Sequence, residues 1–336
     1  MAPKAFGQSV TTTTTTTTTT PRMTKHLDKA APKSTTDTEF VKTSNLIYGI
    51  RTCIILISIL GYYYRNYLQV PVDLTWRYLT SAWWFQSVYF ESFFATFCYV
   101  VIIPIYPFAF HFIKRFDKYK IEPSVNYVHQ TVIGMIIQGF VYLAPLMLMD
   151  TFMVKKYVGI EAEVWDEKRK SWIQTTRALP EEAPSLFQLI FQLIGSIVVY
   201  DALFFCVHLA IHKNFWLYKN LHAVHHDHEV MNAHVTNQLS VSERIILILS
   251  ANFSLKIFNS HPLTRMVFVP TFIFMLVDNH MGYDLPLGMD KIVPWQLMGG
   301  PRKHYHHHVH GGGDYQPFFC YLDKLLEKRR NPKQCD

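Results

Sequence analysis

The chain has 336 residues, of which 49% are hydrophobic and 15% aromatic, whereas only 17% are charged. Charged residues supply about a quarter of an ordinary soluble domain, so this deficit, with the clustering of the apolar residues, indicates a membrane protein. The net charge of +7 does not indicate nucleic-acid binding, because no basic patch is interleaved with stacking aromatic residues. The five cysteines form no CxxC pair and show no framework spacing, so disulfides are not expected.

Residues 1–44 are predicted to be a disordered cytosolic tail. They contain ten consecutive threonines (11–20), prolines and scattered charges, with almost no apolar side chains. Such a segment buries too little surface to offset its chain entropy. It also lacks the apolar core of a signal peptide.

Four long apolar stretches follow, and each approaches or exceeds the ~20 residues that a bilayer-spanning helix needs. They cover residues 45–64, 86–110, 128–149 and 186–207. A fifth apolar region, 245–279, is interrupted around Asn259 and Pro262, and each of its arms is too short for a ~30 Å hydrocarbon core. We therefore predict an all-α, polytopic membrane fold of about four transmembrane helices plus a helical hairpin that dips into the membrane.

The distribution of Lys and Arg in the short loops orients these spans. The tail carries six Lys/Arg against three acids, and residues 114–120 form a basic turn between the second and third spans. The N-terminus, this turn and everything after about residue 207 are therefore predicted to face the cytosol. We expect three regions, namely the tail (1–44), a membrane-anchoring region (45–185) and a catalytic region (186–330).

Fourteen of the 17 histidines lie between residues 208 and 310, and eight of them form three spaced groups. A spacing of i, i+4 or of i, i+3, i+4 directs the rings to one face of a helix. Nine imidazoles exceed what one ion uses, because mononuclear sites take three or four protein ligands. The sequence therefore predicts two metal ions on the cytosolic face. The candidate ligands are His208/His212, His222/His225/His226, His304/His307/His308 and, standing alone after the hairpin, His280.

Two common metal sites do not match this pattern. In zinc peptidases a Glu follows the first His of HxxxH as the general base, but Leu209 stands there. A carboxylate-rich di-iron bundle needs Glu-x-x-His, which does not occur in the chain. Imidazole alone does not select among iron, zinc, copper and nickel. A redox metal beside an apolar, membrane-held substrate suits the oxidation of strong C–H bonds.

One acidic residue, Asp201, lies inside the fourth predicted span. A carboxylate is costly there, so it should face the protein interior and have a partner. We expect it to accept a hydrogen bond from an imidazole of the second or third histidine group, because metal-bound histidines usually donate their free N–H to such a carboxylate. The alternative is an aspartate that bonds a hydroxyl or an amide of a neighbouring span.

The three histidine groups, HxxxH, HxxHH and HxxHH in this order, resemble the signature of the fatty acid hydroxylase/sterol desaturase superfamily of membrane di-iron oxidases. The resemblance covers roughly residues 186–326. Where this superfamily usually has Asp after the first His of the third group, the chain has Tyr305, and Asp314 is a candidate substitute. Four further segments resemble a branch that hydroxylates sterol side chains, namely His261-Pro-Leu-Thr264, His280-x-Gly-Tyr-Asp284, Val293-Pro294 and Gly299-Gly300.

The resemblance implies that the histidines bind two irons, that dioxygen is cleaved, and that one oxygen atom enters a cholesterol-like sterol. It also implies a multi-pass protein of the endoplasmic reticulum membrane, and the Lys/Arg distribution places both of its termini in the cytosol. The chain has no strand–GxGxxG–helix pattern for a dinucleotide and no evident heme domain. Electrons would therefore come ultimately from NAD(P)H through a separate b-type cytochrome or flavin reductase.

Three alternatives stay open. The first is a sterol or acyl-lipid desaturase or C-4 methyl oxidase with the same metal site. The second is a histidine-rich membrane zinc transporter, although its ligands would be expected near the bilayer midplane on broken spans. The third is an inactive, sterol-binding relative.

Overall fold

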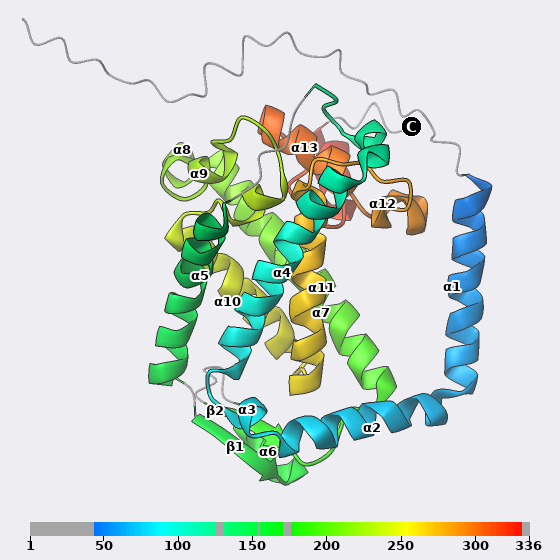
Figure 1. The fold of residues 1–336 in the computed structure, drawn as a ribbon, viewed down its shortest axis with the longest axis vertical. Helices are drawn as coiled ribbons and strands as arrows, with labels where there is room; N and C mark the ends of the chain where they lie inside the picture. Colours follow the sequence, from blue (N-terminus) through cyan, green and yellow to red (C-terminus); the bar gives the residue numbers. More distant parts are fainter. Residues whose placement is uncertain (1–43, 125–130, 154, 171–175, 331–336) are drawn as a thin grey trace, which may run out of the picture. The chain divides into compact units, whose positions relative to one another are not determined.

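The structure is a computed structural model that describes residues 44–124, 131–153, 155–170 and 176–330. The predicted disordered tail lies outside the described residues, apart from Ser44, which caps the first helix. The described part is mostly helical, as predicted, and Figure 1 shows its elements in chain order. The division of the remainder into an anchoring and a catalytic region stays a prediction.

Within the part of the chain that the structure describes, three helices are long and apolar enough to cross a membrane. They are α1 (Asn45–Tyr63), α5 (Val132–Met153) and α7 (Leu186–Lys213), and they coincide with three of the four predicted spans. The remaining predicted span coincides with α4 (Phe90–Phe112), whose described apolar part, Phe90–Ile105, is shorter. The membrane orientation and the full number of spans stay predictions.

Two segments outside the predicted spans carry structure that the sequence analysis did not predict, and the second departs from the all-α prediction. The segment between the first two predicted spans is helical, as α2 (Arg65–Ser81) and α3 (Trp83–Gln86). In the 150–185 segment two short strands, β1 (Lys155–Ile160) and β2 (Thr176–Pro180), pair in parallel and are joined through α6 (Ala162–Arg169). These strands have only six and five residues, too few for a clear alternating pattern in the sequence.

A buried tryptophan connects these two segments. The side chain of Trp76 in α2 is fully buried, and its indole N–H donates to the carbonyl of Pro180 at 3.1 Å. The same apolar cluster includes Phe85, Leu179 and Leu263. Tertiary packing on this tryptophan therefore orders a region whose local sequence is polar and interrupted by Pro71.

The predicted hairpin is present as two helices, α10 (Val241–Ile257) and α11 (Pro262–His280). The Ser240 hydroxyl caps α10 by accepting from the backbone N–H of Glu243, and the His261 ring caps α11 by accepting from Leu263. Both helices pack against α7, and α11 also packs against α4 (Figure 1). Whether the hairpin dips into a membrane stays a prediction.

Short elements after α7 and α11 carry most of the histidines. After α7 come α8 (Phe215–Leu217), a π-helical turn η3 (Tyr218–His222), α9 (Ala223–His226) and η4 (Ala233–Asn237). After α11 come α12 (Met289–Ile292), η5 (Pro294–Gln296), α13 (Gly300–His310) and α14 (Tyr321–Arg330), and the remaining short helix is η2 (Lys114–Tyr119). Helix α13 ends because Gly311 adopts a left-handed conformation (φ 67°) and donates its N–H to the His307 carbonyl at 2.7 Å.

Asp201 is fully buried in α7, but its carboxylate contacts backbone and amide groups instead of the expected imidazole. One oxygen accepts from the backbone N–H groups of Phe318 at 2.8 Å and Phe319 at 3.0 Å, and the other accepts from the Gln316 amide. The expectation of an imidazole partner is therefore wrong, because a C-terminal segment distant in sequence reaches the carboxylate. Asp201 anchors that segment to α7.

We predict that Asp201→Asn lowers the free energy of unfolding by about 1–3 kcal/mol, because the amide replaces an acceptor facing Gln316 by a donor. Denaturant unfolding in detergent measures the change. As a control, Asp117→Asn removes an exposed carboxylate paired with Lys120, and should change stability by less than about 1 kcal/mol. Unchanged stability together with loss of bound metal would instead assign Asp201 to an imidazole.

Candidate metal centre

The structure gathers all nine predicted histidines into two groups. Within each group the ring nitrogens lie within 4.8 Å of one another. Among the described residues these are the groups of His, Cys, Asp and Glu side chains that could hold a metal ion. The first group is His208, His212, His222, His226 and His307, and the second is His225, His280, His304 and His308.

The two groups cut across the sequence motifs. Adjacent histidines separate, so that His225 joins one group and His226 the other, and His307 and His308 divide in the same way. The reason is that consecutive residues on a helix point about 100° apart, since 3.6 residues make a turn. An HxxHH motif can thus supply two neighbouring sites at once. The sequence spacing predicted which histidines come together, but it did not predict which of the two groups each histidine joins.

Backbone carbonyl groups fix the protonation of several rings. His208 Nδ1 lies 2.8 Å from the Tyr315 carbonyl, His280 Nδ1 2.7 Å from that of Leu276, and His307 Nδ1 2.8 Å from that of Gly313. A carbonyl oxygen only accepts hydrogen bonds, so each of these Nδ1 atoms carries the proton. In a neutral imidazole the Nε2 atom then presents a lone pair to the interior.

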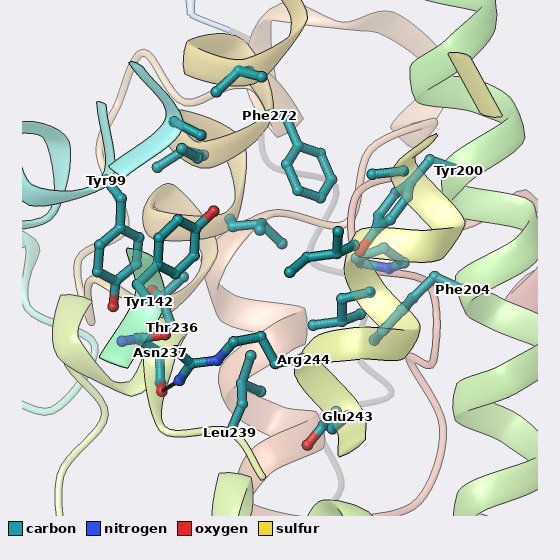
Figure 2. Close-up of a pocket in the computed structure, with 18 of the residues that line it drawn as sticks. Tyr99, Tyr142, Tyr200, Phe204, Thr236, Asn237, Leu239, Glu243, Arg244 and Phe272 are labelled. Carbon is teal, nitrogen blue, oxygen red and sulfur yellow. Dashed lines mark hydrogen bonds between the residues drawn. The ribbon is translucent and has the colours of Figure 1, made fainter. Parts of the chain in front are cut away.

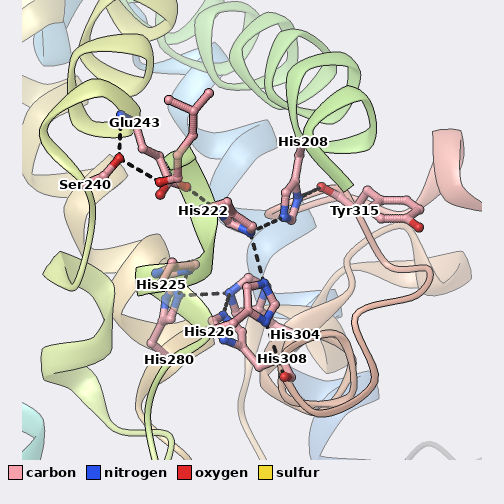
Figure 3. Close-up of polar contacts among 11 residues, drawn as sticks. His208, His222, His225, His226, Ser240, Glu243, His280, His304, His308 and Tyr315 are labelled. Atoms are coloured by element: carbon pink, nitrogen blue, oxygen red, sulfur yellow. Dashed lines mark hydrogen bonds and ion pairs between the residues drawn. The ribbon is translucent and has the colours of Figure 1, made fainter. Parts of the chain in front are cut away.

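In both groups the Nε2 atoms of neighbouring rings lie at close range. His222 Nε2 lies 3.0 Å from the Nε2 atoms of both His208 and His226, and His280 Nε2 lies 3.0 Å from that of His304 (Figure 3). In the first group His208, His222 and His226 each have an acceptor at Nδ1, so their Nε2 lone pairs face one another and repel at this distance unless a cation lies between them. Nitrogen ligands bind zinc-like ions at about 2.0–2.1 Å, which brings two ligands of one ion to roughly 3 Å from each other. The donor set therefore fits a metal ion in each group.

Burial keeps these rings neutral, as metal ligands must be. Removal from water, followed by the proximity of other imidazoles, lowers the pKa of His226 and His307 to about 3. The same causes lower the pKa of His222, His225 and His304 well below the usual value. The rings are therefore lone-pair donors at neutral pH. Four buried ring nitrogens of the two groups have no hydrogen-bond partner and are available to a metal, namely His212 Nε2, His307 Nε2, His225 Nδ1 and His304 Nδ1.

Glu243 is a site residue that the sequence analysis missed. Its carboxylate accepts from His222 Nδ1 at 2.6 Å, and both side chains are buried (Figure 3). Carboxylates in this position orient a metal-bound imidazole and strengthen it as a donor. The available signal was the pattern Ser240-x-x-Glu243, which is typical of a helix N-terminus. That pattern predicts a cap, and it does not reveal a contact 21 residues away.

The remaining candidates lie outside the two groups. Asp314 lies 3.4 Å from His306 and 3.8 Å from Lys303, and both of these side chains are exposed on α13. Tyr305, which stands where the superfamily usually has Asp, donates its hydroxyl to Glu122 at 3.1 Å. His228 Nε2, in contrast, lies 2.9 Å from His308 Nδ1 and adds an outer contact to the second group.

An apolar cavity of about 190 Å³ adjoins both groups. Its walls come from α4, α5, α7, α10 and α11, and Figure 2 shows part of them. Phe204, Phe268 and Phe272 line its length. Histidines of both groups form one end, namely His208, His222, His225, His280 and His304. The arrangement can hold an elongated apolar molecule with one part against the histidines.

Comparisons with known proteins identify relatives whose named activities fit a metal centre beside an apolar cavity. Residues 193–328 match the family model of fatty acid hydroxylases. The chain is 34% identical over 155 residues to the cholesterol 25-hydroxylases of Rattus norvegicus and Homo sapiens, covering 46% of this chain and 52% and 57% of those proteins. It thus spans about half the length of these curated relatives. No solved structure matches.

A longer but more distant similarity covers most of the chain. A methylsterol monooxygenase-like protein of Dictyostelium discoideum is 28% identical over 267 residues, which cover 76% of this chain and 91% of that protein. All nine histidines of the two groups lie within the segment that matches the family model. The resemblance seen in the histidine motifs is therefore confirmed by the match of residues 193–328 to the fatty acid hydroxylase model.

Proposed function

We propose that the protein is a sterol-modifying monooxygenase with a dinuclear iron site. The observation that carries the proposal is the meeting of two buried imidazole groups with one end of an elongated apolar cavity. The named activities of the relatives support a sterol as the substrate class. The position of His208 and His212 in the last two turns of α7 disfavours the transporter alternative, which expects ligands at a midplane break.

Each group would hold one iron through the ring nitrogens that face inward. Bound iron would supply the redox chemistry by which dioxygen attacks a C–H bond. The residues of this chain perform the remaining tasks. The aromatic wall binds the apolar substrate and excludes water, the carbonyls of Tyr315, Leu276 and Gly313 keep the Nδ1 protons in place, and Glu243 orients His222.

Two positions on the sterol are candidates for oxidation. Hydroxylation of the side chain, as in a 25-hydroxylase, is supported by the relatives with the higher identity. Oxidation of a ring methyl group is supported by the relative that matches across most of the chain. In both cases we propose residence in the endoplasmic reticulum membrane with cytosolic termini, and electrons from NAD(P)H through a separate b-type cytochrome or flavin reductase.

Metal content tests the dinuclear site. Protein made with iron available should hold two irons per chain. His222→Ala and His304→Ala should each leave about one, because each removes the ring that lies closest to its neighbours in one group. His310→Ala, which changes an exposed ring outside both groups, should keep two. Elemental analysis that finds one iron or fewer in the unaltered protein would contradict the assignment.

The product tests the reaction. In cells that express the protein we expect an oxygen-dependent sterol product heavier by one oxygen atom, and heavy-isotope dioxygen should label it. Lipid mass spectrometry makes both measurements, and it also locates the oxygen on the side chain or on the ring end. A product that only lacks two hydrogens would identify a desaturase instead.

A further inference from the structure

One wall of the cavity carries a buried arginine whose hydrogen bonds are incomplete (Figure 2). Arg244 is only 8% exposed, and its Nη2 group donates to the Asn237 carbonyl at 3.2 Å. Its Nε and Nη1 groups have no hydrogen-bond partner. Buried polar groups without partners are rare and costly, so each needs an explanation.

No nearby acid accounts for this charge. Across the described residues no acidic side chain forms an ion pair with Arg244. Glu243, its neighbour in sequence, contacts His222, and Glu91 pairs with Arg265. The Arg244 guanidinium lies 5.8 Å from the centre of the Tyr142 ring. This cation–π contact offsets part of the cost of burying the charge. The ring lies over the guanidinium, however, and does not accept a hydrogen bond from the Nε or Nη1 group.

Two buried hydroxyl groups line the cavity with Arg244. The Thr236 hydroxyl has no hydrogen-bond partner. The Tyr99 hydroxyl lies next to Asn237 without a well-formed hydrogen bond, and its ring stacks on Tyr142 with the centres 4.6 Å apart. Three helical segments, α4, η4 and α10, thus bring several unused donors to one wall of an otherwise apolar cavity. An oxygen atom of a ligand would satisfy them.

We propose that Arg244, with Tyr99 and Thr236, binds the hydroxyl oxygen of the sterol. The proposal rests on the proposed function. A simple sterol carries a single polar group, its hydroxyl, and this subsite would bind it. The rest of the cavity, lined by Phe268 and Phe272, matches the apolar remainder of the molecule.

The place of this subsite along the cavity has a consequence for the reaction. Tyr99 packs in one apolar cluster with Ile273 and Val277, which precede His280 in α11 by seven and three residues. The subsite therefore lies about 5–10 Å from His280 along the helix axis. A hydroxyl held there places the hydroxyl-bearing ring, not the end of the side chain, nearest to the histidines, and so favours oxidation at the ring end.

A second arginine of the cavity provides the matched comparison. Arg265 lies fifteen residues before His280, about 22 Å along the axis, and its charge is already paired with Glu91 at 3.2 Å. A hydroxyl bound at Arg265 would place the side chain at the histidines. The two arginines therefore correspond to opposite orientations of the sterol.

Binding to purified protein in detergent tests the proposal without requiring turnover. The probes are labelled cholesterol and, as competitor, cholestane, which has the same carbon skeleton without the hydroxyl. We expect the unaltered protein to prefer cholesterol by about 10- to 100-fold, the usual range for a hydrogen bond to a charged group. Arg244→Gln should abolish this preference and leave cholestane binding unchanged, whereas Arg265→Gln should retain it.

The remaining outcomes are equally decisive. Tyr99→Phe and Thr236→Val each remove one hydroxyl at nearly constant volume and should weaken the preference, which keeps the test valid if Arg244→Gln does not fold. Preserved preference in Arg244→Gln, or in both hydroxyl variants, would overturn the subsite while leaving sterol binding intact. Absence of any binding by the unaltered protein would instead refute the proposed function, and the subsite with it.

Discussion

The repulsion among buried imidazole lone pairs is the constraint on which this structure depends. Nitrogen atoms such as His208 Nε2 and His222 Nε2 lie 3.0 Å apart in a space from which water is largely removed. Without a cation the groups would be unstable, since neutral rings cannot donate to one another when their protons are held on the opposite nitrogen. The surrounding fold holds the rings in this arrangement, and bound metal would convert the repulsion into coordination.

The segment after α13 shows how that arrangement is maintained. Residues 313–319 supply the carbonyls that accept from His208 and His307. The segment itself is fixed by Asp201 in α7 and by Asp323, which accepts from the backbone N–H groups of Tyr315 and Gln316. Asp201 and Asp323 therefore support the imidazoles through the backbone, whereas Glu243 does so through a direct contact with a ring.

The sequence was informative where chemistry depends on local spacing. The three histidine motifs and His280 identified all nine rings of the two groups, because helical spacing is a local property. The division of His225 from His226, the partner of Asp201 and the role of Glu243 depend on contacts between segments far apart in the chain. The parallel pair of strands was missed for the same reason, since its order depends on packing against Trp76.

The cavity brings the histidine groups and the buried Arg244 to one substrate. Its histidine end would provide the oxidation, whereas Arg244 on its side wall would set the orientation of the substrate. A single buried charge can fix which end of a rigid molecule is oxidised, because the apolar walls alone do not distinguish the two ends strongly. Two members of one family could thus oxidise opposite ends of a sterol with the same metal ligands.

X-ray absorption at the iron edge of the iron-loaded protein tests the central claim most directly. The account predicts a coordination shell dominated by nitrogen, with the outer scattering that is typical of imidazole rings, for both irons. A shell dominated by carboxylate oxygen or by sulfur, or iron that shows no imidazole scattering, would contradict it.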